Sequence, residues 1–304
     1  MERPLRGYPR GDDMDELVRQ LRELNTNFRR FLDQFRPAVD LSVLDRYVAF
    51  KVFPKGDQLM IEGIDAPDPV TFDELKGIDH AINPLKRNTM QFLRGLPCND
   101  VLIYGPRGTG KSSAIKAVLN KYRDEGLRMI EVDRAALLRL HETLDLIRGR
   151  EEHFIVFCDD LTFHEEEDAY IRLKAVLEGG LETRADNILI YATSNRRHLM
   201  PERVSDNTAV YSDGELHPSE SVEERVSLSD RFGLRIGLVQ FDVDKYLDIV
   251  RNYVRLRKIE VWDDEMLRKR ALQWATSHGS FSGRTARQFA DDLEGREGLD
   301  SDDV

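Results

Sequence analysis

The stretch GPRGTGKSS at residues 105–113 constrains the fold of this chain more than any other feature. It follows the apolar run VLIY at 101–104, which is typical of a buried strand, and it leads into a helical pattern that begins near Lys111. Glycines at this spacing let the backbone turn with its N–H groups pointing inward, and the following helix presents its positive end. The sequence therefore predicts a phosphate-binding loop, or P-loop, between a strand and a helix.

Individual positions of the loop carry separate predicted roles. Lys111 is expected to reach the outer phosphates of a nucleotide, and Ser112 is expected to ligate magnesium. The residues predicted to bind the nucleotide are Gly105, Pro106, Arg107, Gly108, Thr109, Gly110, Lys111, Ser112 and Ser113. A GTPase would also need an N/T-K-x-D guanine reader, but the nearest match, NKYR at 120–123, has arginine in place of the aspartate. The L-S-G-G-Q motif of ABC proteins is absent from the sequence.

Apolar runs that alternate with helical patterns predict an α/β fold around a five-stranded parallel sheet. The predicted strands are 101–104, 129–132, 154–158, 188–193 and 234–239. Because these runs are continuously apolar, we expect helices to cover the sheet on both faces. After residue 242 the pattern is helical only, with segments that each open on a capping residue.

Two acids follow the strand FIVFC and are predicted to serve the reaction. Asp159 is placed to hold magnesium through water, and Asp160 is placed to polarise an attacking water. Asp160 stands where a glutamate is common, and the loss of one methylene withdraws the carboxylate by roughly 1.5 Å. Misplacement on this scale can cost about 100-fold in rate, so the sequence predicts slow hydrolysis. Rival bases, which we expect to begin the next helix, are Glu165, Glu166 and Glu167.

Three further polar residues are predicted to complete the site. Asn195 ends the strand segment ATSN and could hydrogen-bond the attacking water or the terminal phosphate. Arg231, in SLSDRFGL, could neutralise charge on the leaving phosphate of a neighbouring subunit. Arg284, in FSGRTARQF, could reach the phosphates from a helix of the same chain, with Arg287 as the rival.

In this order, these elements resemble the AAA+ family of ATPases over about residues 70–294. The segments DDLTF, YATSNRRHL, ELHP and LSDRFGL also resemble a bacterial AAA+ family described only as predicted ATPases of unknown function. The resemblance implies the P-loop NTPase fold, with a five-stranded parallel sheet and a C-terminal helical lid. It implies that 105–112 is Walker A, 154–160 Walker B, Asn195 sensor 1, Arg231 the arginine finger, Arg284 sensor 2, and the surroundings of Gly77 and Ile78 the adenine pocket. It further implies ATP and Mg²⁺ as cofactors and self-association into a ring or arc, often a hexamer.

The chain is predicted to contain several segments around this core. These are a flexible N-terminus at 1–11, a helix with a small β-rich part at 12–69, the α/β nucleotide-binding subdomain at 70–241, the helical lid at 242–294 and an acidic tail at 295–304. Apolar residues spaced by three and four predict a helix at 14–35, which either docks on its own domain or contacts a subunit or partner. A hairpin is predicted around Pro54 to Asp57.

Composition narrows the possible partners. The 304 residues carry a net charge of −11, which argues against a protein that coats nucleic acid through charge alone. No apolar run approaches the roughly 18 residues of a membrane helix, so no membrane partner is expected. The two cysteines, Cys98 and Cys158, have no zinc-type spacing. We therefore expect a cytoplasmic protein.

Three kinds of function fit these motifs. The first is an ATPase that remodels an unknown protein partner, although the region after the second strand lacks the aromatic–aliphatic–glycine triplet of protein-threading relatives. The second is a DNA-associated ATPase or loader, permitted by basic runs at 195–198 and 251–258 but not favoured by the acidic total. The third is a nucleotide-dependent switch with negligible turnover. A small-molecule kinase would have no use for Arg231.

Overall fold

The computed structural model describes part of the chain. The described residues are 19–21, 23–24, 40–56, 58–163, 168–178, 185–197, 199, 210–212, 215–217, 228–260, 263–297 and 299. By their internal contacts, residues 1–40 and 41–304 form two separate units. In the first unit, the described residues 19–21 and 23–24 are helical. The rest of the predicted helix at 14–35, the predicted N-terminus at 1–11 and Glu165 to Glu167 lie outside the described residues.

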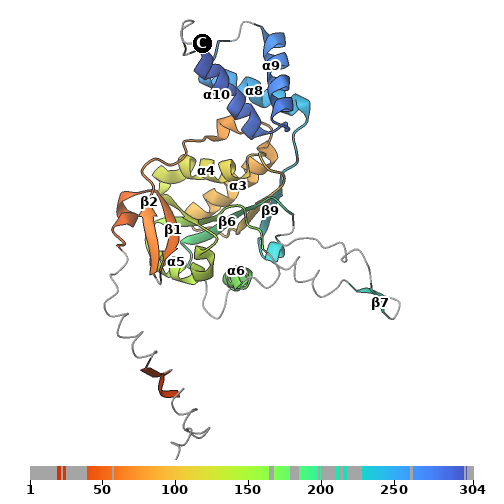
Figure 1. The fold of residues 1–304 in the computed structure, drawn as a ribbon. Helices are drawn as coiled ribbons and strands as arrows, with labels where there is room; N and C mark the ends of the chain where they lie inside the picture. The colour runs from red at the N-terminus through yellow and green to blue at the C-terminus, as the bar shows by residue number, and fades with distance from the viewer. Residues whose placement is uncertain are drawn as a thin grey trace, which may run out of the picture. The chain divides into compact units, whose positions relative to one another are not determined.

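A mixed, mostly parallel sheet forms the centre of the second unit (Figure 1). Its strands, in chain order, are β1 (Ala49–Lys55), β2 (Gln58–Gly63), β3 (Val101–Tyr104), β4 (Leu127–Val132), β5 (His153–Cys158), β6 (Ile188–Ser194) and β9 (Leu234–Gly237). Their spatial order is β2-β1-β4-β5-β6-β3-β9. A separate antiparallel pair is formed by β7 (Val210–Ser212) and β8 (Glu215–His217).

The prediction of a five-stranded sheet is wrong, because the described part of this sheet has seven strands. The predicted strands correspond to β4, β5, β6, β3 and β9, which are all parallel. The predicted hairpin is confirmed, but it joins the sheet: β1 pairs in parallel with β4, and β2 pairs antiparallel with β1. The backbone of β1 thus covers the β4 edge, and its side chains Phe50 and Val52 are fully buried. The sequence pattern is local and does not say which edge a hairpin will join.

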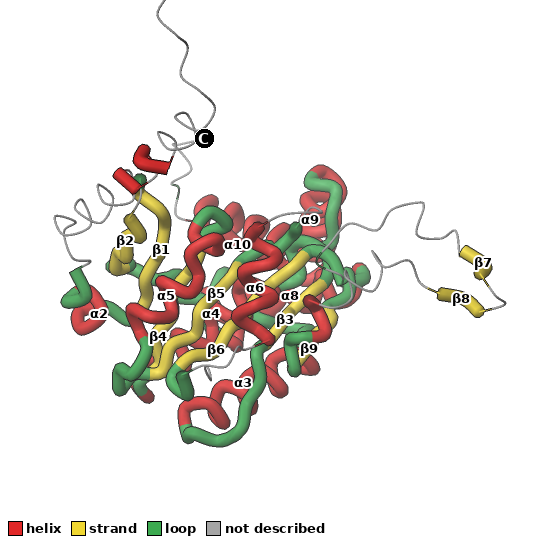
Figure 2. Tube along the Cα trace, turned by 90° about the horizontal axis from the view of Figure 1, so that it is seen from below, coloured by secondary structure: helices red, strands yellow, loops and turns green. Residues whose placement is uncertain are grey.

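Helices cover both faces of this sheet (Figures 1 and 2). The α-helices of this unit are α2 (Val43–Arg46), α3 (Asp79–Leu93), α4 (Lys111–Tyr122), α5 (Leu140–Ile147), α6 (Asp168–Glu178), α8 (Val243–Arg257), α9 (Asp264–Ser277) and α10 (Gly283–Glu297). Short 3₁₀ turns are η1 (Phe72–Glu74), η2 (Arg123–Glu125) and η3 (Ala136–Arg139). The helices α3 and α4 lie on one face, and α5 and α6 lie on the other. Among the described residues, no helix has the length and apolar content that crossing a membrane requires.

The helices α8, α9 and α10 share a hydrophobic core with the face of the sheet that α3 and α4 cover. Tyr246 of α8, Ala271 of α9 and Phe289 of α10 belong to the same buried cluster as Ile103 of β3 and Ile115 of α4. Since the parallel strands all point one way, the carboxyl ends of β3, β5 and β6 meet at one edge, beside the start of α4. In sheets of this kind, ligands bind outside the carboxyl ends of the strands.

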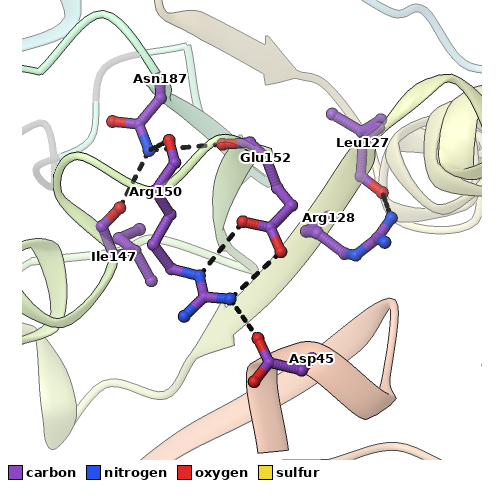
Figure 3. A network of polar contacts seen from close by, with 7 residues as sticks. All are labelled: Asp45, Leu127, Arg128, Ile147, Arg150, Glu152 and Asn187. Atoms are coloured by element: carbon purple, nitrogen blue, oxygen red, sulfur yellow. Dashed lines mark hydrogen bonds and ion pairs between the residues drawn. The ribbon is translucent and has the colours of Figure 1, made fainter. Parts of the chain in front are cut away.

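A polar network closes the opposite edge, at the amino ends of the strands (Figure 3). The side-chain amide of Asn187, just before β6, donates to the backbone carbonyls of Ile147, Arg150 and Glu152 at 2.9, 3.2 and 3.3 Å. The guanidinium of Arg150 donates to both carboxylate oxygens of Glu152, at 3.1 and 3.2 Å, and pairs with Asp45 of α2. These hydrogen bonds hold the pKa of Glu152 below its ordinary value. The network ties α2, the end of α5 and the starts of β5 and β6 together.

Candidate functional site

A cavity of about 490 Å³ lies at the carboxyl edge of the sheet. It is lined by the P-loop and the first turn of α4, by residues that follow β5 and end β6, and by parts of α8 and α10. The predicted site residues found in its lining are Arg107, Gly108, Thr109, Gly110, Lys111, Ser112, Ser113, Asp159, Asp160, Asn195 and Arg284. Side chains from distant parts of the sequence therefore meet in one place.

Lys111 is held at the floor of this cavity and is only 7% exposed. Its ammonium donates to the carbonyls of Gly105 and Pro106 at 2.9 and 2.8 Å, and to Oδ1 of Asn195 at 2.9 Å. Burial lowers the pKa of Lys111, and the nearby carboxylate of Asp160 partly opposes that shift. Gly105 and Pro106 thus contribute to the site through the backbone carbonyls that accept hydrogen bonds from Lys111. A buried cation surrounded by neutral acceptors is suited to an anionic ligand.

The start of α4 adds backbone donors to the same place. Gly110 is the N-cap residue, with φ at 94°, a left-handed conformation that glycine adopts without steric cost. No side chain caps this helix end. The N–H groups of its first turn have no intrahelical partners, and together with the helix dipole they favour a bound anion. Ser112 and Ser113 of that turn line the cavity.

Asp159 receives two hydroxyl donors. The Ser112 hydroxyl donates to Oδ1 of Asp159 at 2.6 Å, and the Thr193 hydroxyl donates to the same oxygen at 2.5 Å. A serine hydroxyl and a carboxylate oxygen this close together are the ligand types that Mg²⁺ prefers. The donor set therefore fits the predicted metal, with Ser112 and Asp159 as the residues that would hold it.

Asp160 has an unusual backbone conformation, with φ at 50°. Its N–H donates to the hydroxyl of Thr193 at 2.9 Å, and its carboxylate accepts a hydrogen bond from the amide of Asn195. Asn195 also accepts from Lys111, so one chain of hydrogen bonds runs from Lys111 through Asn195 to Asp160. Such a chain fixes which way the Asn195 amide faces, because its oxygen accepts and its nitrogen donates.

Thr193 is a residue of this site that sequence reasoning missed. It lies in β6, is 1% exposed and lines the cavity. Its single hydroxyl donates to Asp159 and accepts from the N–H of Asp160, so it links the two acids. A signal was present in the sequence: ILIYATS is an otherwise apolar strand that ends in hydroxyl residues. A buried hydroxyl needs a hydrogen-bond partner, and here the partners are the two acids.

The three arginines take different positions. Arg284 and its rival Arg287 both line the cavity. Arg284 lies beside the P-loop, because a Cβ placed on Gly108 would lie 3.7 Å from Cβ of Arg284. Burial raises the pKa of Tyr253, and the charge of Arg287 partly opposes that shift. The described lining of the cavity does not include Arg231. Its guanidinium instead lies 2.7 Å from the carboxylate of Glu178, at the end of α6.

The lining of the cavity also includes apolar side chains. These are Val70, Leu75, Ile78, Phe241, Ile249 and Tyr253, which belong to one hydrophobic cluster. The segment that carries Val70 is attached to α4, because Asn120 donates to the carbonyls of Asp68 and Val70 at 2.7 and 2.8 Å. On the other side, Asn252 of α8 donates to the carbonyl of Asp73 at 2.7 Å. This apolar part of the lining is therefore held from both the sheet domain and the C-terminal helices.

Comparisons with known proteins match one family model and several solved structures. RuvB of Thermotoga maritima, described as a Holliday junction branch migration motor, matches with a TM-score of 0.44 and 16% identity, covering 77% of this chain and 75% of that chain. A point mutant of the same RuvB matches with a TM-score of 0.46 at 16% identity, with coverage of 77% and 75%. No curated protein matches the sequence. A family model described as "Protein of unknown function (DUF815)" matches residues 45–297.

Proposed function

The chain belongs to the DUF815 family of unknown function, and we propose that it is an ATPase of the AAA+ type that binds ATP with Mg²⁺ and hydrolyses it slowly. One observation carries this proposal. The hydrogen-bond chain from Lys111 through Asn195 to Asp160 meets the Ser112–Asp159–Thr193 cluster in the same cavity. A site that only stored a nucleotide would not need a second carboxylate oriented by an asparagine.

Six residues of the cavity lining have a chemical role in the proposal. Lys111 and the amides of the first turn of α4 bind the outer phosphates. Ser112 and Asp159 hold Mg²⁺, which would shield the charge on the phosphate oxygens. Asp160 accepts a hydrogen bond from the attacking water and orients it. Asn195 holds the side chains of Asp160 and Lys111 in place through its hydrogen bonds to both. Arg284, on the phosphate side, stabilises negative charge that develops as the terminal phosphate leaves.

The C-terminal helices are proposed to act as a lid over the nucleotide. They supply Ile249, Tyr253, Gly283, Arg284 and Arg287 to the lining of the cavity, and Arg284 lies beside Gly108 of the P-loop. Closure of such a lid excludes water from the reacting groups and brings the arginine into place. A subdomain that contributes to both ends of the cavity is suited to sense whether ATP fills it.

We further propose that subunits assemble in a ring or arc and that the work is done on a protein partner. Arg231 lies outside the described lining of its own cavity, which suits a residue that acts on the nucleotide of a neighbouring copy. The DNA alternative rests on the basic runs at 195–198 and 251–258. The net charge of −11 makes it the less favoured alternative, because DNA binding through the phosphate backbone needs clustered cations.

The test is turnover by the purified chain. Phosphate release would be measured with ATP and Mg²⁺ for the wild type, Lys111→Ala and Asp160→Asn. We expect Lys111→Ala to lose ATP binding, because the buried cation is removed. We expect Asp160→Asn to bind ATP normally but to release phosphate at least about 100-fold more slowly, since a positioned base contributes on that scale. Asparagine also tolerates the left-handed conformation at position 160, so this variant should leave the backbone unchanged.

Two outcomes would contradict the proposal. If wild type releases phosphate no faster than Asp160→Asn, the chain binds nucleotide as a switch and not as a hydrolase. If Lys111→Ala binds ATP as tightly as wild type, the cavity is not the nucleotide site. A salt-sensitive shift of labelled DNA by the wild type would favour the DNA-associated alternative over a protein partner.

A further inference from the structure

The P-loop and the first residues of α10 touch directly. The N–H of Gly283 donates to the carbonyl of Gly108 at 2.8 Å. Gly108 has φ at +77°, and a Cβ placed on it would lie 2.7 Å from Cβ of Ser282 and 2.8 Å from Oγ of Ser282. Real Cβ atoms do not come so close to other heavy atoms. We call this meeting of Gly108 with Ser282 and Gly283 the loop–helix contact, and it requires the absence of a side chain at 108.

Ser282 is held firmly from its own side of the contact. Its hydroxyl accepts from the N–H of Thr285 at 3.1 Å, which caps the start of α10. It also shares a hydrogen bond with the Thr285 hydroxyl at 2.8 Å, and Ser280 bonds that same hydroxyl at 2.9 Å. Ser282 is 7% exposed. Because the side chain is fixed by these bonds, the position of Gly108 determines the position of the turn that begins α10.

Arg284 follows this turn directly. It lines the cavity, and a Cβ at Gly108 would lie 3.7 Å from its own Cβ. Lys111 lies on the same loop as Gly108, and Arg284 lies on the same helix turn as Ser282. The loop–helix contact thus joins the loop that carries Lys111 to the helix turn that carries Arg284. The proposed reaction needs both of these cations at the phosphates.

We propose that Ser282 is a positioning residue, which by packing on the bare Cα of Gly108 sets the Arg284 guanidinium at the outer phosphates of ATP. The inference rests on the proposed function. It adds that the P-loop itself, and not only the packing of α10 on α8, fixes the position of Arg284. A change that separates loop from helix should then remove the contribution of Arg284 without removing any group that binds the nucleotide.

The first variant to test is Gly108→Ala in the full chain. The added methyl group meets Ser282, so the loop and the turn before α10 must move apart. We expect kcat to fall by roughly 10- to 100-fold, since small displacements of a catalytic group have costs of this size, while the Kd for ATP changes far less. Hydrogen exchange gives a readout that does not depend on turnover. The N–H of Gly283 donates to Gly108 in the wild type, and it should exchange faster in the variant.

The reciprocal variant supplies the rescue. Ser282→Gly, added to Gly108→Ala, removes the atoms that the methyl group meets, and glycine is itself an accepted N-cap residue. The methyl at 108 then packs on a bare Cα at 282, so the contact is restored with its side chain on the opposite partner. We expect the double variant to regain most of the lost kcat and the slow exchange at Gly283. Ser282→Gly alone leaves two bare Cα atoms, and its kcat should lie between those of wild type and Gly108→Ala.

A matched control separates the contact from backbone strain. Gly149 has φ at +74°, close to that of Gly108, but a Cβ there would meet nothing within 4 Å. Gly149→Ala therefore places a side chain at a similar positive φ without a collision, and its kcat should equal that of wild type. If Gly149→Ala is impaired as strongly as Gly108→Ala, or if the double variant is not rescued while wild type turns over, the positioning role of Ser282 is wrong. A wild type that binds no ATP or does not hydrolyse it refutes the proposed function instead.

Discussion

At the residue scale, the backbone at position 160 explains why the second acid is an aspartate. With φ at 50°, Asp160 occupies the left-handed region, where aspartate and asparagine are several times more frequent than other side chains. A short polar side chain tolerates this conformation because it can hydrogen-bond locally. The conformation is held by the bond from the N–H of Asp160 to Thr193. The shorter acid is therefore matched to a turned backbone.

The prediction at this scale concerns Thr193. Thr193→Val keeps the shape of the side chain but removes the donor to Asp159 and the acceptor for the N–H of Asp160. We expect kcat to fall by about 10- to 100-fold, with a higher Mg²⁺ concentration needed for half-maximal rate, because residues that orient metal ligands have effects of this size. Thr193→Ser keeps the hydroxyl and should retain most of the activity. Steady-state rates across a magnesium titration would measure both. Equal rates for the valine and serine variants would show that the hydroxyl does not act through the acids.

At the element scale, the strands and their order along the chain could be predicted, but their full number in the sheet could not. The predicted bounds of β3 agree with the structure, and β4 begins at Leu127, before the predicted 129. Apolar runs report burial, which local pattern reveals. Pairing of β1 with β4 joins segments far apart in the sequence, and no local pattern encodes it. For the same reason the sequence indicated the P-loop and both acids, but not the contacts of Thr193 with the acids or of Ser282 with Gly108.

The prediction at this scale concerns the network at the amino edge of the sheet (Figure 3). Asn187→Ala leaves three backbone carbonyls without the amide that serves them. We expect the free energy of unfolding to fall by about 1–3 kcal/mol, which is the usual cost of unsatisfied polar groups. Urea denaturation would measure it, with the exposed neighbour Asp186→Ala as the control, expected to stay within about 0.5 kcal/mol of wild type. ATP binding should be unchanged, because the cavity lies at the opposite edge. A variant that loses ATP binding but not stability would contradict this division between the two edges.

At the scale of the whole molecule, Arg231 decides whether one chain is enough for catalysis. It pairs with Glu178 at 2.7 Å within its own chain, on a part of the surface that is about half exposed. Exposed ion pairs of this kind are worth only about 0–1 kcal/mol, so the guanidinium can leave Glu178 for a stronger anion at little cost. The terminal phosphate of a nucleotide on a neighbouring copy would be such an anion.

Subunit mixing tests this prediction. Arg231→Ala and Asp160→Asn should each hydrolyse ATP poorly when purified alone. When the two are mixed, an Arg231→Ala subunit keeps an intact cavity, and an adjacent Asp160→Asn subunit can supply the missing arginine. We therefore expect phosphate release to recover in the mixture, at protein concentrations where light scattering detects assembly. Arg235→Ala, which removes the partner of Asp230 nearby, serves as the control and should stay active. No recovery on mixing, together with full activity of a monomer, would mean that Arg231 does not act between subunits.

The bare Cα of Gly108 also has a consequence for how such a chain can change over generations. A side chain at position 108 collides with Ser282, although these two positions lie far apart in the sequence. A lineage could accept alanine at 108 only after, or together with, the loss of the side chain at 282. A substitution at either position alone lowers activity, so substitutions at the two positions should occur together. Comparing many descendants would then reveal this interdependence as covariation, without any biochemical assay.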